Sequence, residues 1–342
     1  IYASRQDWPE VIRHFSETLR INPDHQDAAE CIFLLSYAYF MQEQFDDCAK
    51  WLRHMMSKYP DNPRTEDGTY WLGMALTFSK KYDEAALEFD TLLEKYPDTI
   101  YREDSSYRRG VCDYGVSDYA NAEVRFNKFV AEFPESKLIG ETYMMLADIA
   151  AYFGGDRLRE ACQLFQRAMD DQNLNVELYN YCAFRCGEIL YDDYKDYPAV
   201  IRHFEDYISR GREESNIPQA LFYIGRSLWN QDEKLGALNR YKEAIEKFGN
   251  ENTVASIGVD LILEEWIGKA RSAEEHLRDE AWRELRTAIK TADQDGKPIL
   301  KLRLTRALLY QSNVTEDYLE QLRQGLLHVT LDQLETRERL LQ

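Results

Sequence analysis

The sequence lacks the short motifs by which enzymes are usually recognised. It has no H-E-x-x-H zinc signature, no phosphate-binding G-x-x-x-x-G-K-[ST] loop and no G-x-S-x-G nucleophile turn. Its histidines are dispersed, and the adjacent acids along its helices point in different directions, so that no catalytic pair is evident. We therefore expect a protein that is not an enzyme and uses no cofactor and no metal.

Positive charge and long apolar runs are also scarce. The chain has 42 Lys and Arg residues against 61 Asp and Glu, which gives a formal net charge of −19. Because nucleic-acid binding depends on neutralising phosphates, this balance argues against DNA or RNA and favours a basic partner. No apolar run approaches the roughly 18 residues of a membrane-spanning helix, so no membrane span is expected.

Cysteine is sparse for a disulfide-stabilised protein, and all six cysteines lie within apolar helical stretches of a long chain. Cys182 and Cys186 are four residues apart, a spacing that could begin a metal site. No nearby histidine or cysteine pair completes a ligand set. We therefore expect both to be small buried hydrophobic residues.

What the sequence does contain is a regular repeat. Four prolines recur 37 residues apart, at Pro23, Pro60, Pro97 and Pro134. A small or apolar residue and then an aromatic residue or leucine precede each proline at fixed distances. The same spacing continues without proline at Ala161/Phe165, Val200/Phe204 and Ala237/Tyr241. A fixed period of this length is the signature of stacked supersecondary units.

Further helical segments lie between these units, at 27–42, 64–79, 101–116, 138–153, 175–191 and 216–230. Each repeat is thus predicted to be a helix A, a short turn, a helix B and a turn into the next repeat. Glycine stands in the middle of several helix A segments, as at Gly73 and Gly110, where it costs about 1 kcal/mol relative to alanine. We expect this cost to be tolerated because the backbone of a neighbouring helix approaches closely.

Residues 70–97, YWLGMALTFSKKYDEAALEFDTLLEKYP, resemble a tetratricopeptide repeat. The family's order of W, L, G, Y, A, F and P is matched by Trp71, Leu72, Gly73, Tyr82, Ala85, Phe89 and Pro97. The resemblance implies an all-α fold, a right-handed superhelical solenoid of helix-turn-helix repeats. It also implies a non-enzymatic scaffold that holds proteins or peptides.

The 37-residue period and the proline turns are similar to a narrower, bacterial periplasmic group. That group includes the outer-membrane-assembly lipoprotein and the Tol–Pal-associated coordinator of cell division. The similarity implies a location in the cell envelope, whereas six cysteines with no evident pairing scheme suit the cytoplasm.

The repeat pattern divides the chain at about residue 250. Residues 1–250 are predicted to hold about seven repeats, of which the first is truncated. Residues 251–342 are predicted to hold diverged helical repeats or a C-terminal cap, because the end of a solenoid must face water. A separate small helical domain is the alternative for this second part.

Two columns in the helix A segments keep the same period, and the resemblance implies that both face the groove of the solenoid. The acidic column is Glu30, Asp67, Asp104 and Glu141. The large apolar column is Phe33, Tyr70, Tyr107 and Met144, continued less regularly by Phe184 and Phe222, with Tyr37 and Tyr114 one turn further on. We expect these residues to bind a protein or peptide segment with basic and apolar side chains.

A purely structural role stays open for each of these columns. The helix dipole alone favours an acid in the first turn of a helix. The aromatic residues can equally serve to pack against the preceding hairpin. The family's best-known peptide site uses lysine and asparagine of helix A to bind a carboxylate, and the acidic column argues against that mode here.

A second function also stays open, the docking or sensor arm of a larger multidomain enzyme or regulator. The chain begins at Ile1 rather than at methionine, and the helical pattern still continues at Gln342. We therefore expect the sequence to be a piece of a longer protein.

Overall fold

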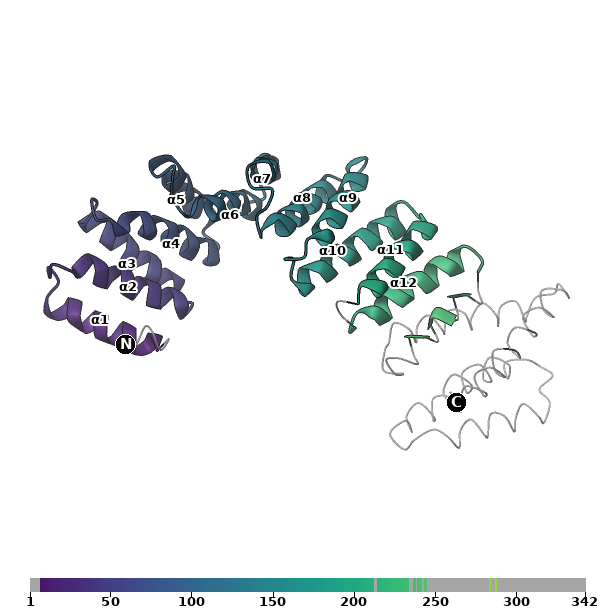
Figure 1. Ribbon diagram of the computed structural model, residues 1–342, viewed down its shortest axis with the longest axis horizontal. Coiled ribbons are helices and arrows are strands. Elements are labelled where there is room, and N and C mark those ends of the chain that lie inside the picture. Colours follow the sequence, from purple (N-terminus) through teal and green to yellow (C-terminus); the bar gives the residue numbers. More distant parts are fainter. Residues whose placement is uncertain are drawn as a thin grey trace, which may run out of the picture. The chain divides into compact units, whose positions relative to one another are not determined.

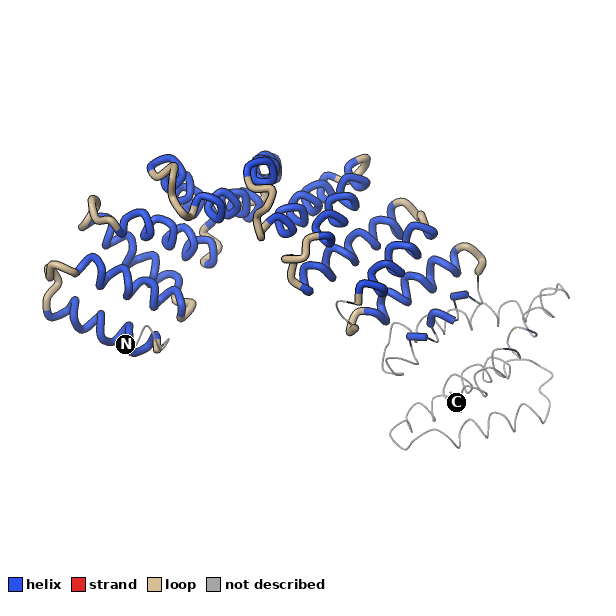
Figure 2. The backbone as a smooth tube through the Cα atoms, in the orientation of Figure 1, coloured by secondary structure: helices blue, strands red, loops and turns tan. Residues whose placement is uncertain are grey.

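The computed structural model describes residues 7–211, 214–233, 236–237, 239–241, 243–244, 283 and 287. Within these ranges the chain forms helices joined by short loops and contains no strand, which confirms the predicted all-α class (Figures 1 and 2). The predicted boundary near residue 250, and the diverged repeats expected beyond it, lie outside the described residues.

The helices alternate in two series that follow the predicted repeats. Helix A of each repeat is α2 (Ala28–Met41), α4 (Arg64–Phe78), α6 (Arg102–Gly115), α8 (Ile139–Phe153), α10 (Val176–Glu188) and α12 (Ile217–Asn230). Helix B is α1 (Trp8–Ile21), α3 (Phe45–Lys58), α5 (Tyr82–Lys95), α7 (Tyr119–Glu132), α9 (Arg157–Asp170) and α11 (Tyr197–Arg210). A short π-helix, η2 (Ile189–Asp193), continues α10. The predicted helix A segments are thereby confirmed.

The chain divides into two compact units, residues 1–186 and 187–342. In the first unit each helix from α1 to α8 packs against the next one in sequence, and α4 also contacts α2 and α6. Helices A of these adjacent repeats therefore lie side by side. In the second unit α11 packs against α12 and against η2.

The core of the first unit follows the sequence period closely. On α5 and α7 the fully buried side chains include Ala85 and Phe89, and Ala122 and Phe126, which are the residues of the helix B pattern. Exposed acids occupy the first turn of α3 and of α5, where the helix dipole favours negative charge. The aromatic residues lie on the buried face of each hairpin and the charged residues on the exposed face. Burial of the apolar face is what holds each hairpin to its neighbours.

The glycines in the middle of helix A make room for an aromatic ring of helix B. A Cβ atom added at Gly73 would lie 2.8 Å from Cε1 of Phe89, and one added at Gly110 would lie 2.7 Å from Cε1 of Phe126. The expectation that a helix backbone approaches here was wrong, because the nearest atoms belong to side chains. In these repeats the aromatic residue of helix B therefore rests directly on the bare backbone of helix A.

Replacing Gly110 by alanine tests this contact. Alanine favours a helix by about 1 kcal/mol over glycine. We nevertheless expect Gly110→Ala to lower the free energy of unfolding by about 1–3 kcal/mol, because its methyl group overlaps the Phe126 ring. Urea unfolding followed by circular dichroism measures the change. In a Phe126→Leu background the same alanine should cost clearly less, and a Gly110→Ala chain as stable as the wild type would contradict the prediction.

Candidate protein-binding surface

The first two acids of the predicted acidic column share one arginine. Arg64, in the first turn of α4, places Nε 2.8 Å from Oε2 of Glu30 and Nη1 2.8 Å from Oδ2 of Asp67. Its guanidinium also lies over the Phe33 ring, 5.0 Å from the ring centroid. The two carboxylates therefore share one counter-charge within the stack, and both remain partly exposed.

Tyrosine hydroxyls hold the acids of this column from the neighbouring repeats. Tyr70 donates a hydrogen bond to Oδ2 of Asp104 at 2.9 Å, and Tyr107 donates one to Oε2 of Glu141 at 3.0 Å. Burial, followed by the neighbouring carboxylate, raises the pKa of Tyr70 and that of Tyr107. Both hydroxyls therefore stay protonated at neutral pH and tie consecutive helices A together.

The large apolar column is mostly enclosed by these contacts. Its members Phe33, Tyr70, Tyr107 and Met144 are buried, whereas Phe184 and Phe222 are partly buried. The Tyr70 ring stacks on Tyr101 with centroids 4.0 Å apart, and Tyr101 in turn donates to Oδ1 of Asp67 at 2.9 Å. Packing within the stack, the alternative left open from the sequence, thus accounts for the contacts of the buried members. The predicted role of the column in partner binding stays a prediction.

The two tyrosines predicted one turn further on are partly exposed. Tyr37 lies between two tryptophan rings, with centroids 5.7 Å from Trp8 and 4.9 Å from Trp71. Tyr114 meets Tyr119 edge to face at 5.3 Å. These rings are therefore supported on one side by other aromatic residues and reach solvent on the other.

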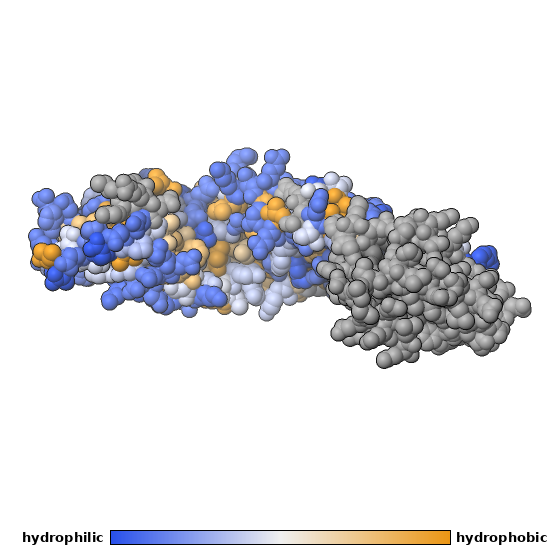
Figure 3. Space-filling model, turned by 90° about the horizontal axis from the view of Figure 1, so that it is seen from below, coloured by the Kyte–Doolittle hydropathy of each residue, from blue (hydrophilic) through white to orange (hydrophobic). Residues whose placement is uncertain are grey.

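A set of exposed apolar residues at the C-terminal ends of helix A was missed from the sequence. Met41, Phe78 and Tyr152 are 41%, 49% and 67% exposed. The sequence did contain a signal for them, because these positions follow the 37-residue period. The period is interrupted only at the repeat between Phe78 and Tyr152, where Gly115 occupies the equivalent position. We call them the exposed apolar column. On the face drawn in Figure 3, hydrophobic residues gather in small patches between hydrophilic ones.

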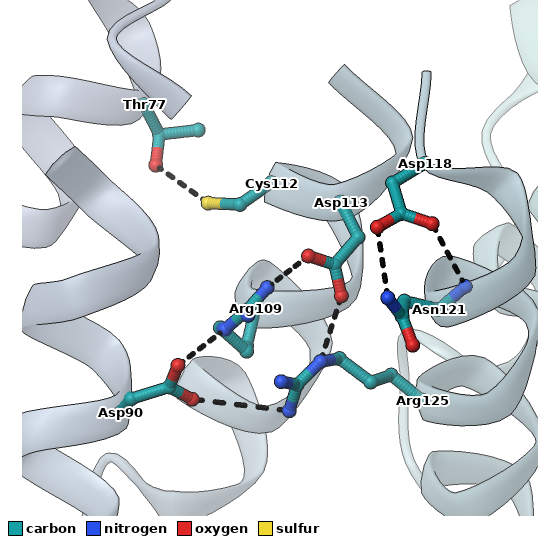
Figure 4. A network of polar contacts seen from close by, with 8 residues as sticks. All are labelled: Thr77, Asp90, Arg109, Cys112, Asp113, Asp118, Asn121 and Arg125. Atoms are coloured by element: carbon teal, nitrogen blue, oxygen red, sulfur yellow. Dashed lines mark hydrogen bonds and ion pairs between the residues drawn. The ribbon is translucent and has the colours of Figure 1, made fainter. Parts of the chain in front are cut away.

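The densest charged cluster in the described part of the chain joins α5, α6 and α7 (Figure 4). Arg109 pairs with Asp113 and places Nε 2.8 Å from Oδ2 of Asp90. Arg125 places Nε 2.7 Å from the other oxygen of Asp113. The Arg109 and Asp113 side chains are only 12% and 10% exposed. Two cations and two anions thus satisfy one another, which indicates a structural tie between repeats.

The cysteine side chains of the described residues lie inside the helical stack or at its edge. None of the six cysteines forms a disulfide, and Cys182 and Cys186 are buried as predicted. Burial raises the pKa of the Cys48 thiol to about 12, which keeps it protonated and unreactive. Among the residues that the structure describes, no group of three His, Cys, Asp or Glu side chains could hold a metal ion. No helix in these ranges is long and apolar enough to cross a membrane.

Asp148, on α8, differs from the acids of the column. It accepts a hydrogen bond on Oδ1 from the hydroxyl of Tyr181 at 2.7 Å, and it forms no ion pair within the described ranges. Burial raises the pKa of Asp148, against the smaller opposing effects of Tyr181 and Arg185. A partly desolvated carboxyl group with no ion pair among the described residues therefore lies on this part of helix A.

Comparison with known proteins identifies the family that one of the repeats matches. The tetratricopeptide repeat family model matches residues 67–99. No curated protein sequence matches the chain. Together with the paired helices, the family match supports a tetratricopeptide-repeat protein.

Three solved structures show the range of similarity. A tetratricopeptide repeat protein from Parabacteroides merdae is 16% identical, and the match covers 77% of this chain and 94% of that protein, with a TM-score of 0.48. PilF of Pseudomonas aeruginosa is 12% identical over 68% of this chain and 98% of its own, with a TM-score of 0.45. YrrB, described as a protein of this repeat class with an unusual peptide-binding site, is 15% identical over 62% and 99%, with a TM-score of 0.44. At these values the similarity carries no conclusion about function.

Removing Asp113 tests the structural role of the charged cluster. Asp113→Ala leaves Arg109 enclosed without its nearest counter-charge, so we expect the free energy of unfolding to fall by about 3 kcal/mol. Urea unfolding measures the loss. Asp118→Ala is the control, since Asp118 is an exposed cap of α7 whose removal should cost much less. Equal losses in the two variants would contradict the structural role.

The raised pKa of Asp148 predicts a pH dependence of stability. The folded-state pKa lies above the unfolded value of about 3.9, so the wild type loses stability as the pH rises through the folded pKa. Asp148→Asn does not titrate and can still accept the Tyr181 hydrogen bond. We therefore expect its melting temperature, relative to the wild type, to increase between about pH 4 and about pH 7. A difference that stays constant or shrinks over this range would contradict the prediction.

Proposed function

We propose that this chain is a non-enzymatic scaffold that binds a segment of a partner protein along the helices A of its first unit. The observation that carries the proposal is the exposed apolar column, because Met41, Phe78 and Tyr152 occupy equivalent positions at the ends of helices A, with Gly115 at that position in the repeat between Phe78 and Tyr152. Large, adaptable side chains of this kind supply most of the affinity at protein interfaces. Repeats of this class are in general interaction modules rather than enzymes.

The chemistry of the partner follows from charge. The chain carries a net charge of −19, and the acids Glu30, Asp67, Asp104 and Glu141 line the same helices. Arg64 and the tyrosine hydroxyls already occupy these carboxylates. A basic segment would therefore be attracted by the overall negative potential more than by a row of free acids. Apolar contacts should set the affinity, and charge should set the association rate and its dependence on salt.

The partly exposed members of the predicted site remain part of this proposal. Tyr37 and Tyr114 present supported ring edges, whereas Tyr70 and Tyr107 are enclosed by their neighbours. Substituting the enclosed pair would disturb the stack itself. The exposed apolar column therefore offers the cleaner test of binding.

The location in a bacterial envelope complex is a further part of the proposal. It is supported by the similarity of the 37-residue period and proline turns to the periplasmic group, and the cytoplasm is the alternative. Fractionation of the source cells with an antibody against the chain would decide between them.

Phe78→Ser combined with Tyr152→Ser tests the binding surface. We expect affinity capture from the source organism to lose its specific partner by about tenfold or more, because two central apolar contacts disappear. Quantitative mass spectrometry measures the captured protein, and circular dichroism checks that the helices persist.

The matched control is Leu87→Ser combined with Val124→Ser. These two residues lie at equivalent positions of α5 and α7, 37 residues apart, and each is as exposed as Tyr152. The control should retain the partner. Retention by both variants, or an equal loss in both, would rule out the helix A surface as the binding site.

A further inference from the structure

Asp148 lies between tyrosines of the two adjacent helices A. From α10, the partly exposed Tyr181 donates its hydroxyl hydrogen bond to Oδ1 of Asp148 at 2.7 Å. From α6, Tyr114 lies close enough that burial and the Asp148 charge together raise its pKa to about 12. All three residues belong to the first unit, residues 1–186. The Asp148 carboxyl group and the Tyr181 ring therefore meet on consecutive helices A, and Tyr114 on the preceding helix A lies within electrostatic range of them.

The carboxylate of Asp148 lacks the counter-charge that comparable acids have. Asp67 is paired with Arg64 at 2.8 Å, and Asp104 with Arg108 at 3.4 Å. Asp148 has no ion pair within 4.0 Å in the described part of the chain, and its hydrogen bond comes from a neutral hydroxyl. Arg185, one turn beyond Tyr181, lowers the pKa of Asp148 without forming an ion pair with it. The anionic group is thus left to meet a cation from outside.

Access to the carboxylate is also available. Oδ2 of Asp148 accepts no hydrogen bond from the residues described. It is also not one of the fully buried polar atoms without a hydrogen-bond partner, which indicates that it reaches solvent. Beside it, Tyr181 presents an exposed ring whose electron-rich face attracts a cation. The thiol of Cys182 adds no reactive group, because burial raises its pKa to about 12.

We propose that Asp148, Tyr114 and Tyr181 bind the charged end of a lysine or arginine side chain of the partner protein. The carboxylate supplies the counter-charge and one hydrogen-bond acceptor, and the two rings flank the aliphatic stem and the cation. This inference rests on the proposed scaffold function. It deepens that function by assigning one basic side chain of the partner to the site around Asp148. An anionic group is excluded there by the carboxylate, and a single acid does not make a metal site.

The test uses a short fluorescein-labelled peptide that contains lysine, leucine and serine, and a second peptide with norleucine in place of lysine. Fluorescence polarisation measures the dissociation constant of each for the whole chain. We expect Asp148→Asn and Tyr181→Ala to weaken binding of the lysine peptide by about fivefold or more. Binding of the norleucine peptide should be weaker for the wild type and should not respond to Asp148→Asn.

Asp156→Asn is the matched control, since it removes the same charge from the exposed turn between α8 and α9. It should change the dissociation constant by less than about twofold. The inference is overturned if Asp156→Asn weakens binding as much as Asp148→Asn, if Asp148→Asn has no effect, or if the wild type does not bind the lysine peptide. The scaffold function is judged separately by the Phe78 and Tyr152 variant, so the two can fail independently.

Discussion

The contact on which the rest of the structure depends is the one between the aromatic ring of helix B and the bare backbone of helix A. Phe89 on Gly73, and Phe126 on Gly110, bring the two helices of a repeat closer than any side chain would allow. The ring sets the spacing of the pair, and the fixed period of the sequence repeats that spacing along the chain. A hairpin built in this way buries one face only, so it needs neighbours to cover the rest.

Many of the large residues of helix A make the contacts between adjacent repeats. The hydroxyls of Tyr70 and Tyr107 reach the acid of the next repeat, and Arg64 joins two acids across adjacent helices A. Because the hydroxyls are held protonated by their raised pKa values, these links persist over the whole neutral range. Several residues that the sequence predicts to bind a partner therefore also join one repeat to the next.

The helices could be predicted from the sequence because a 37-residue period is a one-dimensional signal, and each helix fills the same part of every period. The depth of a side chain such as Tyr107 could not be predicted in the same way, because it depends on the hairpin that packs over it. The environment of Asp148 could not be predicted from the sequence either. Its environment is created by Tyr114 and Tyr181, residues far apart in sequence that become neighbours only when three repeats stack.

A surface of this kind has a consequence for specificity. The groups that are satisfied by neighbouring repeats hold the stack together, whereas the groups that the stack leaves unsatisfied are the ones with free energy available for a partner. Phe78 and Tyr152 keep apolar area in water, and the partly desolvated carboxyl group of Asp148 forms no ion pair within the described residues. Apolar contacts alone would accept many partners, while a desolvated carboxylate penalises every segment that brings no cation to it. Affinity would then come from the repeated apolar positions, and selection among partners from a carboxyl group such as that of Asp148, which forms no ion pair within the described residues.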